Sequence, residues 1–325
     1  MARRTLQLFE AVTALFEQIL AEVNHGHLPT PPKTLFHYSS LDTLQKCIES
    51  RDIRLSHAEY SNDSRELIQA RELILAELDN LIRNSGVPTT FYEEVRQMFE
   101  VRVSDLDVYI FCMCEGSSRA SADLLSQWRA YGRDGRGGAL ALGQPGIEAM
   151  VRHFPGIRVE KVIYQQSQQV KLVQKALDKG FGRFRPSTNR QLVLEETVEV
   201  LTYCIPLMKH VGFEEEREWR LFYMPIKGTG RPHIQFHARR DFLAPFVNLR
   251  QLWVDVRPLI APEGRRFQAI NVPMPSEDNL LPIETVLIGP SLHQSLNVRA
   301  MNKVVEQSAL PIVVEKSAIP YRSVE

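Results

Sequence analysis

The chain has 325 residues, of which 44% are hydrophobic, and its 39 Lys and Arg residues are balanced by 39 Asp and Glu residues. This length and apolar content allow one large or two ordinary domains with a buried core, and they exclude a disordered chain. The charge balance provides no overall positive field, which argues against a general nucleic-acid-binding protein. The four cysteines include no Cys-x-x-Cys pair and no segment resembles a membrane span, so we expect a cytoplasmic protein with no metal and no membrane contact.

Residues 1–33 are predicted to form a helix followed by a linker. Apolar residues recur at helical spacing over residues 5–23, so the apolar face of this amphipathic helix should dock on the body of the protein or on a partner, including a second copy of the chain. The stretch His25–Pro32 is rich in helix breakers and is interpreted as a linker. Its two histidines leave two interpretations open, a metal site and an ordinary loop.

Residues 34–325 are predicted to form a single mixed α+β domain. Apolar runs with strand character predict strands at 35–38, 53–55, 108–114, 139–142, 159–164, 216–223, 234–236, 252–256, 285–288 and 312–314. Helical spacing predicts helices at 41–48, 64–83, 92–101, 124–131, 169–179, 188–208 and 297–307. The glycine-rich stretch 135–138 precedes a strand, whereas phosphate-binding loops precede a helix, so we interpret it as a turn.

The stretch Gly212–Tyr223 carries the strongest chemical signal. Glu216 and Glu218 alternate with Trp219 and its neighbours at the period of a half-buried strand, so the two carboxylates should point the same way. If Trp219 faces a core, the carboxylates face a cleft where they could act as acids or stabilise a cation-like transition state. The alternative is an edge strand with solvated carboxylates, one of them paired with Arg220.

Five short motifs, taken together and in order, resemble a bacterial family catalogued as domain of unknown function 2971. The motifs are Leu35–Ser40, Tyr60–Asp63 with Glu66, Trp128 with Tyr131–Gly132, Phe213 with Glu216–Arg220, and Ile288–Pro290 with Ser317–Arg322. Each motif alone is a weak signal, but five in the same order are specific. The resemblance leaves the N-terminal helix unexplained, and the family description carries no activity.

A second, looser resemblance is to the ADP-ribosyltransferase fold, through the strand-helix-strand opening with His37 and the Glu-x-Glu that enters a later strand. It implies a mixed, mostly antiparallel split sheet with inserted helices, and NAD as the substrate. By the same resemblance, His37 would bind the NAD ribose, Tyr60 or Tyr38 would stack on nicotinamide, Glu218 would be the catalytic carboxylate and Glu216 would assist it. The chain departs from that superfamily in having no clear Ser-Thr-Ser strand and in its long helical insertion.

The remaining polar and aromatic landmarks are assigned to the same cleft, because such residues in loops often serve ligands. They are Ser39, Asn62, Asp63, Trp128 and Tyr131. For Trp128 and Tyr131, packing of a helix face on the sheet is an alternative of equal weight.

The expected function is an NAD-dependent ADP-ribosyltransferase or NAD glycohydrolase, such as a bacterial toxin or phage-defence effector. NAD would be its substrate, no metal would take part, and the acceptor would be an unknown macromolecule. The alternative is a non-catalytic module that senses a nucleotide or binds a protein through the same cleft.

Overall fold

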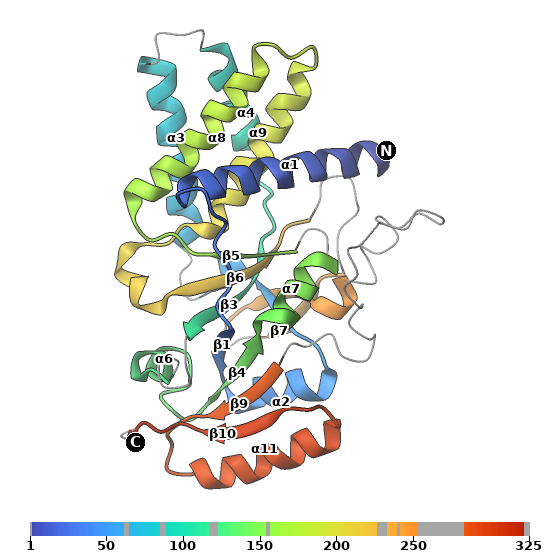
Figure 1. Ribbon diagram of the computed structural model, residues 1–325, viewed down its shortest axis with the longest axis vertical. Helices are drawn as coiled ribbons and strands as arrows, with labels where there is room; N and C mark the ends of the chain where they lie inside the picture. The colour runs from blue at the N-terminus through green and yellow to red at the C-terminus, as the bar shows by residue number, and fades with distance from the viewer. Residues whose placement is uncertain are drawn as a thin grey trace.

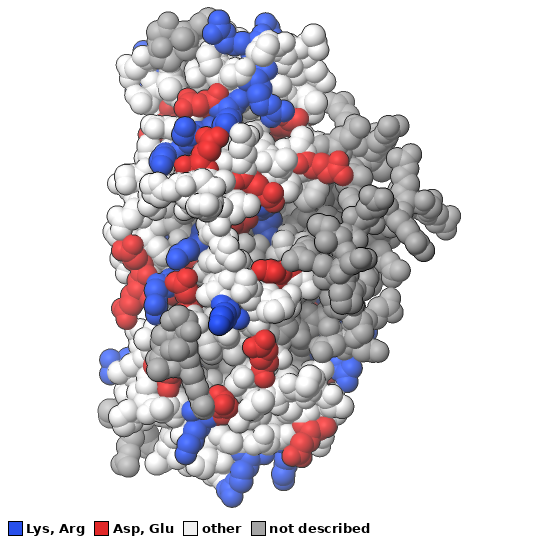
Figure 2. All heavy atoms as spheres, viewed as in Figure 1, with Lys and Arg blue, Asp and Glu red and all other residues white. Residues whose placement is uncertain are grey.

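The computed structural model describes residues 2–61, 65–84, 89–116, 123–153, 157–225, 233–238, 241–252 and 283–321. Asn62 and Asp63 lie outside this described part of the chain, as does most of the strand expected at 252–256. Within it, no helix has the length and apolar character needed to cross a membrane. Acidic and basic side chains are interspersed over the face shown in Figure 2.

The structure confirms an α+β fold whose helices and strands follow one another in a mixed order (Figure 1). The α-helices are α1 (Ala2–Val23), α2 (Leu41–Ser50), α3 (Glu66–Asn84), α4 (Thr90–Val103), α6 (Leu125–Ala130), α7 (Gln144–His153), α8 (Gln166–Phe184), α9 (Arg190–Cys204) and α11 (Gln294–Ser308). The strands are β1 (Thr34–Ser39), β2 (Arg54–His57), β3 (Tyr109–Gly116), β4 (Gly138–Gly143), β5 (Ile157–Lys161), β6 (Glu218–Tyr223), β7 (Gln235–Ala238), β8 (Leu243–Asn248), β9 (Ile283–Ile288) and β10 (Val313–Lys316). Short 3-10 turns are η1 (Ala58–Tyr60), η2 (Ile205–Leu207) and η3 (Val211–Glu216).

The sheet forks at β3. On one edge β3 pairs along its length with β6, which pairs in turn with β5. On the other edge its last residues, 114–116, pair with β1, whereas its first residues, 109–110, pair with β2. One branch therefore continues as β1-β4-β9-β10 and the other as β2-β8-β7. Except for the parallel β9–β10 pair, the described ladders are antiparallel, so the prediction of a mixed and mostly antiparallel sheet is confirmed.

Helices cover both faces of the sheet. The bundle face, defined by Ile110, Cys112 and Phe222, packs against the apolar sides of α1, α3, α4, α8 and α9, which gather at one end of the molecule (Figure 1). The opposite face, which carries Phe111 and Met113, packs against α2, α7 and α11. All six residues of β6 are consequently buried. The half-buried character expected for this strand is therefore wrong, because both of its faces are covered.

The apolar side of α1 packs on the body of the protein. Val12, Phe16 and Ile19 belong to the same buried cluster as residues of α8 and α9. Arg158 of β5 makes two contacts with this helix. Its guanidinium forms a 3.3 Å ion pair with Glu17 and lies over the ring of Phe16. Of the two alternatives for this helix, docking on the body is the one observed.

Two of the helices and strands that the structure describes were not predicted, and both contain a proline. In α7, Pro145 is the second residue, where a helix tolerates proline because the first four amides have no partner within the helix. In β8, Pro245 lies within the strand opposite Phe236, although proline usually argues against a strand. The predicted strand at 252–256 is not seen at Leu252, which lies in a short helical segment.

Candidate functional site

A charged cluster lies on the bundle face of β6. It consists of Glu66 at the start of α3, Lys209 after η2, Glu216 at the end of η3, and Glu218 and Arg220 of β6. Glu218 and Arg220 pair across the sheet with Cys114 and Cys112. Cys112 packs against the helical bundle and Cys114 packs against a smaller cluster under α6. The charges thus lie between two apolar clusters on one face.

Both oxygens of Glu218 are bound by cations. Arg220 donates from Nε to Oε1 over 2.7 Å and from a terminal nitrogen to Oε2 over 3.0 Å, and Lys209 Nζ binds Oε2 over 2.8 Å. Arg220 also donates to the carbonyl oxygen of Pro206 and to Glu66. The backbone amide of Glu218 donates to the hydroxyl of Tyr164 over 2.8 Å. Glu218 therefore makes four hydrogen bonds to three residues, Arg220, Lys209 and Tyr164.

Burial makes this pairing strong and costly to break. The side chains of Glu218 and Arg220 are each 2% exposed. Burial alone would raise the pKa of Glu218, but the charges of Arg220 and Lys209 outweigh it and lower the pKa to about 2. Burial raises the pKa of Glu66 despite its contact with Arg220. Glu218 is thus ionised at neutral pH and acts as an anchor rather than as a group that exchanges protons.

Glu216 is the carboxylate of the cluster that reaches solvent. Its side chain is 13% exposed, against 2% for Glu218 and 6% for Glu66. Lys209 Nζ binds its Oε2 over 2.6 Å, and the hydroxyl of Tyr131 donates to its Oε1 over 2.7 Å. The ring of Phe213 lies 4.9 Å from the same Lys209 nitrogen and is itself partly exposed. Glu216 is therefore an oriented carboxylate at the surface edge of a buried ionic network.

A single left-handed residue brings Glu216 and Glu218 together. Arg217 has φ of 43°, so the chain turns sharply there, and the strand begins only at Glu218. The predicted strand alternation through Glu216 is wrong, because that residue ends η3. The expectation that both carboxylates point the same way is nevertheless confirmed, since both bind the ammonium of Lys209.

Five of the side chains described above lie within one matched family segment. A family model described as Protein of unknown function (DUF2971) matches residues 127–221. Over these residues the chain is similar to the DUF2971 family. The match confirms the family predicted from the motifs, and it includes Tyr131, Lys209, Glu216, Glu218 and Arg220. No curated protein and no solved structure matches the chain.

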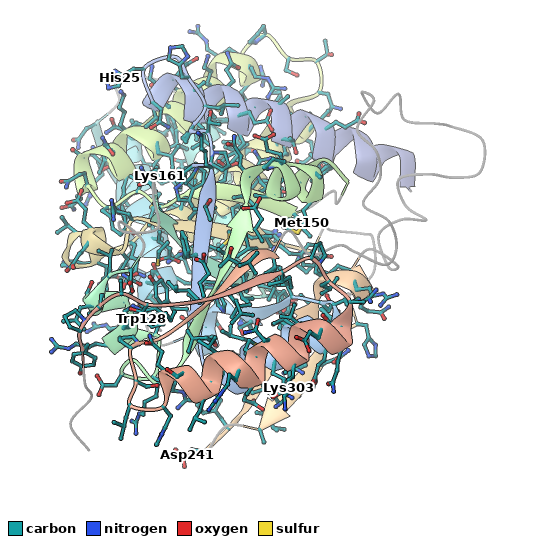
Figure 3. The ribbon with its side chains drawn as sticks, turned by 60° about the horizontal axis from the view of Figure 1, so that its bottom comes forward. His25, Trp128, Met150, Lys161, Asp241 and Lys303 are labelled. Atoms are coloured by element: carbon teal, nitrogen blue, oxygen red, sulfur yellow. The ribbon has the colours of Figure 1, made fainter. Side chains whose placement is uncertain are left out.

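Within the DUF2971 segment, Trp128 packs instead of facing a ligand. Trp128 is labelled in Figure 3. Its ring is fully buried and lies edge-on to Tyr38 with the ring centroids 4.8 Å apart, and its Nε1 donates to Asp123 over 2.7 Å. Tyr38 is also buried. Of the two alternatives for Trp128, packing of a helix on the sheet is the one observed. Tyr131, in contrast, donates a hydrogen bond to Glu216, which lies in the same matched segment.

His37 lies on the other face of the sheet. Phe36 pairs with Cys114, which pairs with Glu218, so Phe36 and Glu218 share the bundle face and the next residue of β1, His37, points away from it. The His37 ring stacks on Phe111 with the ring centroids 4.0 Å apart, and burial lowers its pKa to about 4. The prediction that His37 and the two carboxylates converge on one groove is therefore wrong.

Two other predicted site residues lie after β2 and at the end of β1. Tyr60 lies after β2, with its ring 5.4 Å from His57 and 5.8 Å from Phe242. Ser39 ends β1 opposite Gly138.

Three members of the cluster were missing from the predicted site. Arg220 appeared only in the edge-strand alternative, as the partner of a solvated carboxylate. Glu66 belonged to a family motif but had no assigned role, and the sequence around it indicated only a helix start. Lys209 carried no signal, because a lone lysine after a helix is normally a surface residue. Their positions follow from packing between distant parts of the chain.

Proposed function

We propose that this chain cleaves the bond between nicotinamide and ribose in NAD, as a glycohydrolase or an ADP-ribosyltransferase, and that Glu216 is the carboxylate that faces the sugar. The observation that carries this proposal is the oriented and partly exposed Glu216 beside Tyr131 and Lys209. The forked sheet supports the comparison with the ADP-ribosyltransferase fold. The position of His37 weighs against a ribose-binding role for that residue.

The charge balance of the cluster suits such a reaction. Among its five side chains, three carboxylates face two cations, which leaves a net charge of −1 if all are ionised. When the bond from C1′ to the ring nitrogen breaks, its electron pair neutralises the pyridinium, and positive charge develops on the ribose. A fixed carboxylate lowers the energy of that charge. Water, or a nucleophilic group of an acceptor, then bonds to C1′ and releases its proton.

Glu218 takes a different role from the one first expected. Because Arg220 and Lys209 occupy both of its oxygens and it is 2% exposed, it positions Lys209 instead of contacting the sugar. Lys209 in turn positions Glu216. The Glu-x-Glu pair is thus divided into an outer residue that meets the ligand and an inner anchor.

A non-catalytic nucleotide-binding module is the second candidate. It is favoured by the fact that each oxygen of Glu216 and Glu218 already accepts a bond from a protein side chain. A carboxylate that is saturated in this way stabilises the protein and contributes less to a transition state. This candidate expects binding of NAD or a related nucleotide without release of nicotinamide.

Incubation of the purified protein with NAD separates the two candidates. Under the enzymatic proposal nicotinamide is released, Glu216→Gln abolishes the release, and Glu215→Gln leaves it unchanged because that neighbouring carboxylate is exposed and outside the cluster. A thermal shift with NAD but no nicotinamide supports the binding module. If there is neither release nor a shift, or if Glu216→Gln releases nicotinamide as fast as the parent, the enzymatic proposal is rejected.

The biological role of a toxin or phage-defence effector is part of the same proposal. Expression in a bacterial host should lower cellular NAD and slow growth in the parent and in Glu215→Gln, and should do neither in Glu216→Gln.

A further inference from the structure

We infer that the C-terminal segment Ser317–Tyr321 is a strap that positions Tyr131, and through it Glu216, with Tyr321 and Asp134 as the positioning pair. The segment follows β10 and contacts Asp123, just before α6, and the apolar cluster under α6. It is anchored on both sides of Tyr131 in the sequence, once at Asp123 and once at Asp134.

The first anchor is Asp123, which precedes α6. Its Oδ1 accepts bonds from Trp128 Nε1 over 2.7 Å and from the Ser317 hydroxyl over 2.6 Å, and its Oδ2 accepts from the backbone amide of Ala318 over 2.7 Å. One carboxylate therefore ties the strap to the buried tryptophan of α6. Ile319 adds apolar contact with the cluster under α6.

The second anchor is the turn that follows Tyr131. The hydroxyl of Tyr321 donates to Asp134 Oδ1 over 2.7 Å, and the guanidinium of Arg129 lies 5.2 Å from the centre of the Tyr321 ring. A Cβ at Gly135 would lie only 3.2 Å from that ring, so the ring also rests against the backbone of the turn. The strap thus contacts residues both before and after Tyr131.

The backbone of this turn requires outside support. Arg133 and Asp134 have φ of 51° and 55°, a left-handed conformation that non-glycine residues adopt at a cost. Such conformations persist when surrounding contacts determine them. The bond from Tyr321 to Asp134 is a contact of this kind, and Tyr131 lies two residues before the strained pair. Loss of the bond should let the turn relax and weaken the contact between Tyr131 and Glu216.

Amide hydrogen exchange tests the strap without reference to activity. In Tyr321→Phe, which keeps the ring and removes the hydroxyl, we expect about fivefold faster exchange in peptides covering 124–136 and 211–217, the change that loss of one ordinary hydrogen bond produces. Asp134→Ala, which removes the acceptor oxygen, should also speed exchange, and the double variant should be no worse than Asp134→Ala alone, because both substitutions remove the same bond. Tyr92→Phe, in a buried tyrosine of α4 that stacks on Phe181, is the control.

Unchanged exchange at 211–217 in Tyr321→Phe, or an equal increase in Tyr92→Phe, overturns the inference. A second arm rests on the proposed function: where the parent releases nicotinamide, Tyr321→Phe should lower kcat with KM unchanged, and should have no further effect in a Tyr131→Phe background. A parent with no nicotinamide release removes only this arm, so the exchange result decides the strap by itself. An effect of Tyr321→Phe on kcat that adds fully to that of Tyr131→Phe also overturns it.

Discussion

His37 donates a hydrogen bond from Nδ1 to the backbone carbonyl oxygen of Cys112 over 2.8 Å. A carbonyl can only accept, so the imidazole carries its proton on Nδ1. Cys112 lies between the residues of β3 that pair with β1 and those that pair with β2, at the point where the sheet forks. The side chain of His37 thus donates a hydrogen bond at the point where the neighbouring strands diverge, which gives this partly buried histidine a structural role.

His37 should make the protein sensitive to mild acid. Burial lowers its pKa from the ordinary value of 6.5 to about 4, so between these values the unfolded chain binds a proton that the folded chain does not. Its contribution is fully present above pH 6.5 and is lost as the pH falls towards 4. His37→Asn, which keeps a donor but does not titrate, should lose less stability over this window. Urea unfolding of both proteins at pH 7 and pH 5 measures the difference, and parallel losses would contradict the role.

Glu218 and Glu216 should differ in their effect on stability. Glu218→Gln leaves Lys209 and Arg220 buried with less compensating charge, so we expect a loss of about 3–5 kcal/mol. Glu216→Gln removes charge at the partly exposed edge and should cost about 1 kcal/mol. Urea unfolding at pH 7 gives both values, with Glu215→Gln as an exposed control. An equal cost for the two substitutions would show that the division into anchor and outer residue is wrong.

Protonation of Glu218 should lower the stability of the protein in a lower pH range than protonation of His37 does. The pKa of Glu218 is lowered from 4.5 to about 2, so its contribution is present above pH 4.5 and disappears as the pH falls towards 2. Stability curves of the parent and Glu218→Gln should therefore approach each other below pH 4.5. A constant gap between the curves down to pH 2.5 would contradict the lowered pKa.

Glycine is required at position 137 because the backbone of Ser39 and Gly132 lies too close to leave room for a side chain. A Cβ there would lie 2.2 Å from the carbonyl oxygen of Ser39 and 2.9 Å from that of Gly132, and backbone cannot move aside easily. Gly137→Ala should therefore destabilise by at least about 2 kcal/mol. Gly182, on the open side of α8, meets nothing within 4 Å, so Gly182→Ala should stabilise by up to about 1 kcal/mol. Thermal unfolding of the two variants would show opposite shifts, and a neutral Gly137→Ala would refute the close packing.

Local patterns in the sequence predicted most of the regular elements. Apolar spacing placed α3, α8 and α11 near their observed positions, and alternation placed β1, β3 and β9. The elements α7 and β8 were not predicted, because each contains a proline, which local propensity disfavours but which the surrounding structure accepts. The DUF2971 motifs identified Glu216, Glu218 and Tyr131, which do lie together.

The sequence by itself determined which residues alternate along each strand and which motifs the chain carries. It could not determine whether His37 lies on the same face of the sheet as Glu218, because that depends on the register between β1, β3 and β6. A register shift of one residue moves every side chain of a strand to the opposite face. The cluster around Glu218 depends likewise on Glu66 and Lys209, which only the packing of α3 and η2 against β6 brings within bonding distance. The composition of the site depends on tertiary contacts, because the strength of an ion pair depends on the distance between its two groups in the folded protein. These partners are far apart along the chain.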